Sequence, residues 1–278
     1  MRQKKKEKSI LHYSPLGKKQ EYADRYDAAL LYAVSRDMGR EPLGLTGGLP
    51  FVGQDIWNIY ELSWLNPSGR PVVALAELRV PVTSPFLIES KSMKLYFNSL
   101  NMTSFADAAQ VQEVLTQDLS RCAGAAVDVC IREAADGAVL LTAPQGICID
   151  QAPVEVFHYQ VQPEALRCSP ASCSETLFTH LFRSRCPVTG QPDWATVMVR
   201  YTGPAMDQGG LLEYLVSYRT HQSFHEACVE RMFVDIQRQC RPEFLEVTAR
   251  YTRRGGIDIN PVRASHPGVW RNERTFFQ

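Results

Sequence analysis

The residues best suited to covalent chemistry lie in one short segment, SRCPVTGQPDW, at positions 184–194. Two prolines and a glycine between Cys186 and Asp193 favour a compact turn, which can bring the thiol and the carboxyl group close together. A thiol beside His or Arg shifts toward its reactive thiolate, and a partly buried carboxylic acid can keep a proton to deliver. The pair is therefore a candidate nucleophile and proton donor. The other interpretation is that Cys186 is a buried small apolar residue, as most cysteines are.

Two further segments carry groups that bind phosphates or polar rings. Residues 89–96, ESKSMKLY, stand where a strand is expected to give way to a helix, so backbone donors and two lysines could meet an anion there. Residues 251–261, YTRRGGIDINP, place Arg253 and Arg254 before two glycines, which suits a phosphate clamp. Many basic turns share this second pattern, so it is a weak signal by itself.

His225 and Glu226 open the long helix predicted after residue 224. Together they could bind a polar ligand, since one can exchange a proton and the other can accept hydrogen bonds. They could also be an ordinary helix start, with Ser223 as N-cap and Glu226 as its capping-box partner three residues later. The local sequence leaves both interpretations open.

Periodicity predicts the elements that position these residues. In the first half, a strand at 59–65 and a strand at 72–82 flank a turn at 66–69, and a helix is expected over 90–98. A second helix follows, with apolar residues at helical spacing, and then a strand at 127–131 that alternates apolar and polar residues. The helical positions are Phe105, Val111, Val114, Leu115 and Leu119.

The same order recurs about 120 residues later in the chain. Residues 69–71, GRP, align with 190–192, GQP, at an offset of 121, and the helices and the last strand align at offsets of 118 to 120. Antiparallel hairpins followed by paired helices predict an α+β fold with two similar modules and with the helices on one face of each sheet.

The two modules differ at the residues that could do chemistry. Leu65 and Val72 stand opposite Cys186 and Asp193, although turn geometry requires neither the thiol nor the carboxylate. Similarly, Ala106 and Asp107 stand opposite His225 and Glu226. Conversely, only the first module has the ESKSMKLY segment. Each module is incomplete alone, so we expect a duplicated enzyme whose halves contribute different parts of one composite site.

Composition excludes several classes of function. The 278 residues are 45% hydrophobic and 22% charged, with 30 basic and 30 acidic side chains. This is the composition of a globular protein, and its balanced charge argues against tight nonspecific binding of nucleic acid. No stretch has the 18 apolar residues of a membrane span, and the basic start has no apolar segment of signal-peptide length. We therefore expect a cytoplasmic protein with a small ligand and neither nucleic acid nor membrane as a direct partner.

The eight cysteines are scattered without CxxC spacing, which is typical of free thiols in a reducing compartment. Neither a disulfide framework nor a metal site is predicted. The expected organisation is a flexible basic segment at 1–20, a first module at 21–135, a connecting segment at 136–175 and a second, catalytic module at 176–278.

Four motifs in this order carry a family resemblance: ESKSMKLY at 89–96, CPVTGQPDW at 186–194, FHEACVER at 224–231 and YTRRGGIDINP at 251–261. The chain resembles the NADPH-dependent 7-cyano-7-deazaguanine reductases, the nitrile reductases of queuosine biosynthesis in tRNA modification. The resemblance is to the long, two-module subgroup and extends from about Tyr22 to Arg263. It implies tandem tunnelling-fold (T-fold) modules with antiparallel sheets and helices on one face.

The resemblance also implies a mechanism, in which Cys186 attacks the nitrile carbon to form a thioimide and Asp193 supplies protons. Two molecules of NADPH would complete a four-electron reduction to 7-aminomethyl-7-deazaguanine. The implied substrate-binding residues are Ile88, Glu89, Ser90, His225 and Glu226. The implied cofactor-binding residues are Ser90, Lys91, Arg254 and Gly255. No GxGxxG motif opens a βαβ unit, so a Rossmann-type cofactor site is not expected.

Other classes remain open at this stage. A cysteine-dependent nitrile hydrolase would use the same thioimide but would let water attack it, and it would consume no NADPH. A zinc cyclohydrolase on the same fold would need metal ligands beyond Cys186 and His225, and the motifs offer no convincing third. Another enzyme for purine analogues on the T-fold is a further alternative. A noncatalytic binding module would not require Cys186 and Asp193. We expect a homodimer, because closed two-fold dimers are the commonest assembly.

Overall fold

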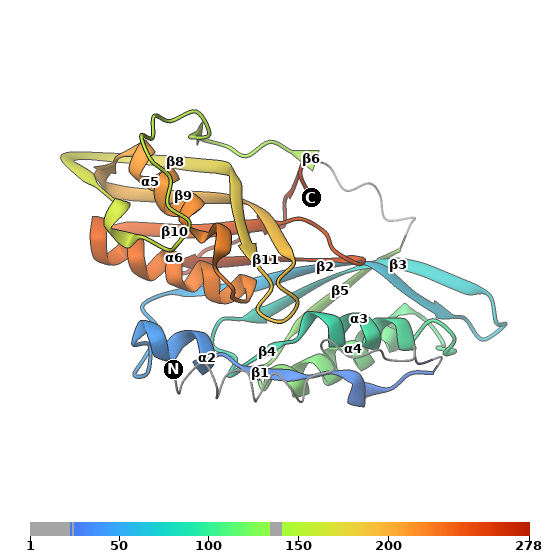
Figure 1. Ribbon diagram of the computed structural model, residues 1–278. Helices are drawn as coiled ribbons and strands as arrows, with labels where there is room; N and C mark the ends of the chain where they lie inside the picture. Colours follow the sequence, from blue (N-terminus) through green and yellow to red (C-terminus); the bar gives the residue numbers. More distant parts are fainter. Residues whose placement is uncertain (1–22, 24, 134–140) are drawn as a thin grey trace. The chain divides into compact units, whose positions relative to one another are not determined.

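The computed structural model describes residue 23, residues 25–133 and residues 141–278 (Figure 1). The basic segment predicted at 1–20 and the first residues of the predicted connecting segment lie outside this part of the chain. The chain divides into two compact units, both discontinuous in sequence. Unit 1 comprises residues 1–38, 55–138 and 253–258, and unit 2 comprises residues 39–54, 139–252 and 259–278.

Unit 1 consists of antiparallel strands and two main helices. Its elements are η1 (Ala28–Leu30), β1 (Ala33–Ser35), β2 (Val52–Leu65), β3 (Pro71–Pro81), β4 (Phe86–Ile88), α3 (Ser90–Ser99), α4 (Ala108–Ala123) and β5 (Asp128–Glu133). The first three residues of β2 belong to unit 2. The strand order is β5-β3-β2, and β1 pairs separately with β4.

Alternating burial explains how β2 and β3 position the rest of unit 1. Leu62 and Trp64 of β2 are buried, with the residues between them more exposed, and Leu78 and Val80 of β3 repeat the pattern. Such alternation gives a strand one apolar face. Tyr96 of α3 is fully buried, and its hydroxyl donates to Asp118 of α4 at 2.8 Å. The apolar face and this polar contact fix both helices.

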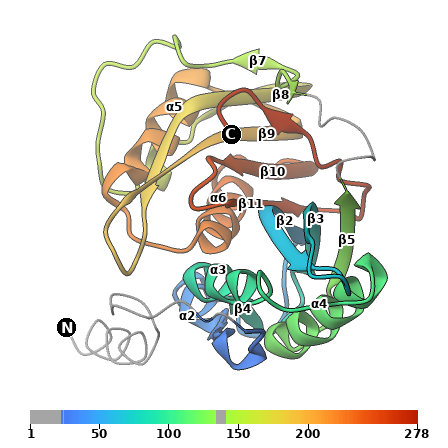
Figure 2. The ribbon, with the colours of Figure 1, turned by 90° about the vertical axis from the view of Figure 1, so that its right-hand side faces the viewer.

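Unit 2 has longer strands and a second pair of helices (Figure 2). Its elements are η2 (Glu41–Leu43), β6 (Leu141–Thr142), β7 (Ile147–Cys148), η4 (Pro163–Ala165), β8 (Cys168–Arg185), β9 (Pro192–Met206), α5 (Gln208–Val216), η5 (Ser217–Thr220), α6 (His225–Cys240), β10 (Phe244–Tyr251), β11 (Ile257–Ala264) and β12 (Arg274–Thr275). The strand order is β11-β10-β9-β8-β7, antiparallel except for β7 beside β8. The short helix α2 (Asp37–Arg40) spans the boundary between the units.

Buried ion pairs connect α6 to its neighbours in unit 2. Glu230 accepts hydrogen bonds from Arg40, at 2.8 and 2.9 Å, and from Arg263 of β11, at 2.9 and 3.2 Å. All three side chains are at most 8% exposed. Buried charges are tolerated when they are paired in this way. The pairs hold α6 against β11 and against the segment that precedes β2.

The predicted α+β class is confirmed, and the two units repeat one order of elements. The hairpin β2–β3 corresponds to β8–β9, the helices α3 and α4 correspond to α5 and α6, and β5 corresponds to β10. The module limits predicted at residues 135 and 176 stay a prediction. Among the described residues, no helix combines the length and apolarity needed to cross a membrane.

Backbone hydrogen bonds shift the internal alignment by one residue at the hairpin turn. Leu65 and Arg185 make the same pair of bonds with the segment before the long helix of their units. The partners are Thr103 and Phe105 for Leu65, and His221 and Ser223 for Arg185. Cys186 therefore corresponds to Asn66, and the alignment of Cys186 with Leu65 was wrong. The cause is one extra residue in the second turn, where Gly190 N donates to Cys186 O, while Gly69 N donates to Asn66 O.

Candidate active site

The turn that carries Cys186 connects the ends of β8 and β9. Cys186 N donates to Gln191 O at 2.9 Å, and Gly190 N donates to Cys186 O at 3.0 Å. Gly190 has a φ of 68°, the left-handed conformation that glycine adopts without a steric penalty. The sequence therefore folds into a tight turn, as predicted, and the Cys186 side chain is half-buried. Cys186 lies one residue past β8 and Asp193 lies one residue into β9.

Asp193 faces the beginning of α6. Its carboxylate Oδ2 lies 3.5 Å from Nε2 of His225, the first residue of that helix, and Asp193 is only 8% exposed. The His225 ring stacks on Tyr251 of β10, with centroids 3.7 Å apart and planes 7° apart. Stacking fixes the imidazole plane, so its Nε2 stays directed at the carboxylate. Unit 2 thus brings together two of the predicted site residues from different elements.

The beginning of α6 is not an ordinary capped helix start. Its N-cap is Phe224, which makes no side-chain capping hydrogen bond, so the alternative interpretation of a capping box formed by Ser223 and Glu226 is wrong. In unit 1, by contrast, Asp107 is the N-cap of α4 and its carboxylate accepts from Gln110 N. Glu226 is 4% exposed. A side-chain cap would stabilise this helix, so its uncapped start next to the buried carboxylate is not explained by helix stability alone.

A second thiol, Cys228, lies in the same region but is unsuited to nucleophilic attack. It is fully buried, and burial raises the pKa of its thiol to about 12. The charges of Asp193 and Glu226 raise that pKa further. Only a thiolate attacks efficiently. Cys186, half-buried on the turn, is therefore the reactive candidate.

Positive charge surrounds the exposed side chain of Trp194, next to Asp193. The guanidinium groups of Arg183 and Arg219 lie 5.6 and 5.4 Å from the centre of its ring, in cation–π range. Partial burial, followed by the like charges of Arg219 and Arg185, lowers the pKa of Arg183. Anionic groups are therefore favoured near this end of the hairpin.

Unit 1 carries the other predicted residues. Glu89 lies between β4 and α3 and is the N-cap of α3: its carboxylate oxygens accept from Lys91 N at 2.8 Å and from Ser92 N at 2.7 Å. Burial raises the pKa of Glu89, and the two backbone hydrogen bonds oppose that shift. Ile88 is 4% exposed, at the end of β4, and Ser90 begins α3. Ile88, Glu89 and Ser90 are consecutive, so they lie together at the junction of β4 and α3.

The predicted cofactor residues of unit 1 lie on α3 and on one neighbouring turn. Gly255 and Gly256 have φ values of 65° and 80°, and a Cβ atom added to Gly255 would clash with the side chain of Lys94. The Arg254 side chain is exposed beside them, and Lys91 and Lys94 are half-buried. Unit 1 thus places a cationic helix face against a glycine turn. Such a combination suits phosphate groups, because the backbone can approach closely while the side chains supply charge.

Comparisons with known proteins identify the family. The family model described as nitrile reductase, 7-cyano-7-deazaguanine-reductase N-term matches residues 22–131, and the one described as QueF-like protein matches residues 192–268. The NADPH-dependent 7-cyano-7-deazaguanine reductase of Azoarcus sp. (strain BH72) is 54% identical over 254 residues, or 91% of this chain and 90% of that protein. The chain belongs to the NADPH-dependent 7-cyano-7-deazaguanine reductases.

A second relative agrees with this family assignment. The NADPH-dependent 7-cyano-7-deazaguanine reductase of Desulfotalea psychrophila (strain LSv54 / DSM 12343) is 51% identical over 263 residues, or 94% of this chain and 95% of that protein. A solved structure, the archaeosine synthase QueF-Like in the apo form, is 19% identical, with a TM-score of 0.31, over 36% of this chain and 99% of that chain. The assignment rests on the sequence matches.

In this reductase family member, the predicted site residues divide between the units. Unit 2 holds Cys186, Asp193, His225 and Glu226, and unit 1 holds Ile88, Glu89, Ser90, Lys91, Arg254 and Gly255. Sequence reasoning missed the contributions of Tyr251 and Cys228. Tyr251 begins a motif segment that was recognised, but its role follows only from the stacking of its ring on His225 of α6.

Proposed function

We propose that this protein reduces the nitrile of 7-cyano-7-deazaguanine to the primary amine with NADPH, through a thioimide on Cys186. Close relatives are named for this activity over nearly the whole chain. The observation that carries the proposal is the arrangement in unit 2, where a half-buried thiol ends one strand of a hairpin and Asp193, 3.5 Å from His225, begins the other.

The covalent step balances with groups that this chain supplies. The Cys186 thiolate adds to the nitrile carbon, one carbon–nitrogen π bond breaks, and the nitrogen takes a proton to give the thioimide. A soft thiolate and an acid at the developing nitrogen anion suit a weak electrophile of this kind. Asp193 is the proposed acid. His225, held flat against Tyr251, is the proposed positioning group for its carboxyl.

Bound NADPH would supply a hydride first to the thioimide and then to the imine that is released when the carbon–sulfur bond breaks. The groups proposed to hold it are Ser90, Lys91, Arg254 and Gly255. The glycine turn and the lysines of α3 fit a phosphate-rich cofactor, since Gly255 has the φ that only glycine adopts readily and Lys94 lies directly over it.

Each unit has a buried glutamate that is proposed to recognise the deazaguanine ring, Glu226 in unit 2 and Glu89 in unit 1. A guanine-like edge presents adjacent N–H donors, and a carboxylate accepts such donors in pairs. Glu226 is buried at the first turn of α6. Glu89 already accepts two backbone N–H groups at the start of α3, so it is rigidly held when it meets the ring. Ile88 would supply an apolar surface next to Glu89.

The decisive experiment mixes the purified protein with 7-cyano-7-deazaguanine and follows the absorbance of NADPH. We expect two NADPH consumed for each amine formed. Without NADPH, the intact mass of the protein should increase by the mass of the nitrile, and Cys186→Ala should lose both the adduct and turnover. Product formation without NADPH consumption would indicate a nitrile hydrolase instead. Turnover without any trapped adduct would refute the covalent mechanism.

We further propose that the enzyme is a cytoplasmic homodimer. All eight cysteines are free, as expected in a reducing compartment, and closed two-fold dimers are the commonest assembly. Light scattering coupled to size-exclusion chromatography measures the oligomeric state directly. A mass other than twice that of the 31.3 kDa chain would contradict the dimer.

A further inference from the structure

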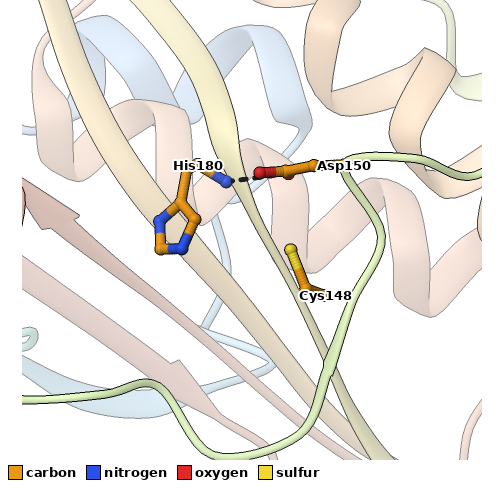
Figure 3. Close-up of side chains that lie close together, drawn as sticks. All are labelled: Cys148, Asp150 and His180. Carbon is orange, nitrogen blue, oxygen red and sulfur yellow. Dashed lines mark hydrogen bonds between the residues drawn. The ribbon is translucent and has the colours of Figure 1, made fainter.

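We propose that Cys148, Asp150 and His180 bind a transition-metal ion of the zinc type. The ligand atoms of these three side chains all lie within 4.8 Å of one another. Figure 3 shows the sulfur and the carboxylate on the segment that includes β7, facing the imidazole on β8. The sequence predicted no metal site, because a Cys-x-Asp pair and a distant histidine carry no recognisable spacing. All three residues lie in unit 2, and none belongs to the proposed catalytic set.

Backbone pairing brings the three residues together. The strands β7 and β8 are parallel, with Cys148 opposite Phe178, and Ile149 N donates to Phe178 O at 2.9 Å. His180 lies two residues beyond Phe178, and Asp150 lies two residues beyond Cys148. Because side chains two residues apart in a strand share a face, this register places the imidazole on the same side as the thiol.

Second-shell hydrogen bonds orient two of the ligands. The Asp150 atom Oδ1 accepts from the Thr179 hydroxyl at 2.6 Å and from His180 N at 3.0 Å, which leaves Oδ2 for a metal. Nδ1 of His180 lies 2.8 Å from Oγ1 of Thr196. In the tautomer where Nδ1–H donates to that hydroxyl, Nε2 presents its lone pair. Metal-bound histidines are characteristically oriented in this way by a partner on the other nitrogen.

The donor set selects the class of ion. A thiolate, an imidazole and a carboxylate suit zinc and its neighbours, whereas calcium and magnesium prefer oxygen ligands alone. Three protein ligands leave one position for water. Zinc bonds of about 2.0 to 2.3 Å require ligand atoms about 3.3 to 3.8 Å apart, so binding needs a closure of about 1 Å. Cys148 is exposed and can make that movement.

The same contacts argue against a catalytic triad at this place. In a Cys-His-Asp triad, the carboxylate must accept from the imidazole ring. Here Asp150 accepts from the backbone of His180 and from Thr179, while the ring nitrogen Nδ1 contacts Thr196. The arrangement therefore suits metal binding better than catalysis. We expect the ion to stabilise the structure, because it would link the two-residue edge strand β7 to β8.

The test uses the full-length protein, reduced and freed of metal by a chelator, and titrated with Co²⁺ and Zn²⁺. We expect one ion per chain, a thiolate-to-cobalt charge-transfer band, and a higher melting temperature with Zn²⁺. Cys148→Ser should abolish the band, and His180→Gln should weaken binding by at least about 100-fold, more than the loss of an outer partner usually costs. Thr196→Val, which removes only such a partner, should weaken binding about 10- to 100-fold.

The matched control is Cys130→Ser, which removes another exposed strand cysteine, in unit 1, and should bind as wild type does. Circular dichroism confirms that each variant is folded. An unchanged cobalt band in folded Cys148→Ser, or no uptake by the wild-type protein, would overturn the proposal. Equal losses in Cys148→Ser and Cys130→Ser would do so as well, since they would indicate nonspecific binding to thiols.

Discussion

Replacing Glu230 by alanine should destabilise unit 2 strongly. Glu230 lies on the helix that begins with His225 and Glu226, and it is the shared hydrogen-bond acceptor for Arg40 and Arg263. The Arg263 side chain is 0% exposed and the Arg40 side chain is 8% exposed. Without the carboxylate, both guanidinium groups would keep their charge in a place that water does not reach.

The magnitude follows from this burial. Removing one partner of a buried ion pair typically costs about 3 to 5 kcal/mol, because the remaining charge is left uncompensated. For domains of about 150 to 250 residues, each kcal/mol shifts the melting temperature by about 2 to 4 °C, and this 278-residue chain is close to that size. We therefore expect Glu230→Ala to lower the melting temperature by about 6 to 20 °C. Loss of four charge-assisted hydrogen bonds favours the upper part of that range.

Thermal unfolding of the full-length protein, followed by circular dichroism, measures the effect. Glu243→Ala is the matched control, because that glutamate is exposed in the loop between α6 and β10 and should change the melting temperature by less than about 2 °C. A similar small change for Glu230→Ala would refute the reasoning. It would mean that solvent or other groups compensate both guanidinium charges.

Further predictions concern the site and the pH dependence of stability. Asp193→Asn should keep the hairpin turn but slow formation of the thioimide adduct and lower kcat about 100-fold or more, as measured by NADPH consumption, because the proton donor is lost. Gly255→Ala should raise KM for NADPH several-fold with little change in kcat, since an alanine at a φ of 65° is strained and clashes with Lys94. Cys228→Ala should still form the thioimide adduct. Loss of the adduct in that variant would contradict the assignment of Cys186 as the nucleophile. The free energy of unfolding should fall as the pH rises above about 9, because the native state keeps the Cys228 proton up to a pKa of about 12 while the unfolded chain loses it near 9. Denaturant titrations from pH 8 to 11 test this sign, and Cys228→Ala should flatten the decline.

The sequence predicted the fold well where local patterns decide it. The strand expected at 72–82 is β3, at Pro71–Pro81, and the helix expected at 90–98 is α3, at Ser90–Ser99. Alternating burial and helical spacing are properties of short segments, so the sequence of each segment alone was enough to predict the strand or the helix. The one-residue error at the turn arose because a single insertion changes hydrogen bonding without changing the Gly-x-Pro pattern that anchors the alignment.

The site was predictable only in part, for a physical reason. The thiol, the acid and the helix start are local motifs, but their relationship depends on tertiary contacts. The stacking of His225 on Tyr251 joins positions far apart in sequence, and so does the pairing of Cys148 with His180 across β7 and β8. The capping-box interpretation failed because α6 begins one residue later than it requires: the N-cap is Phe224, whose side chain cannot accept a hydrogen bond, and Glu226 is buried.

The interleaving of the two units has a consequence for how the protein forms during synthesis. Arg40 leaves the ribosome about 190 residues before its partner Glu230, and Arg263 follows later still. Unit 1 likewise awaits residues 253–258 from the far end of the chain. Neither unit can therefore complete its buried polar pairs until almost all of the polypeptide has emerged. Until then, Arg40 keeps its charge in water. Termination before residue 253 should release a chain that can complete neither unit, and termination before residue 263 should release one that cannot complete unit 2.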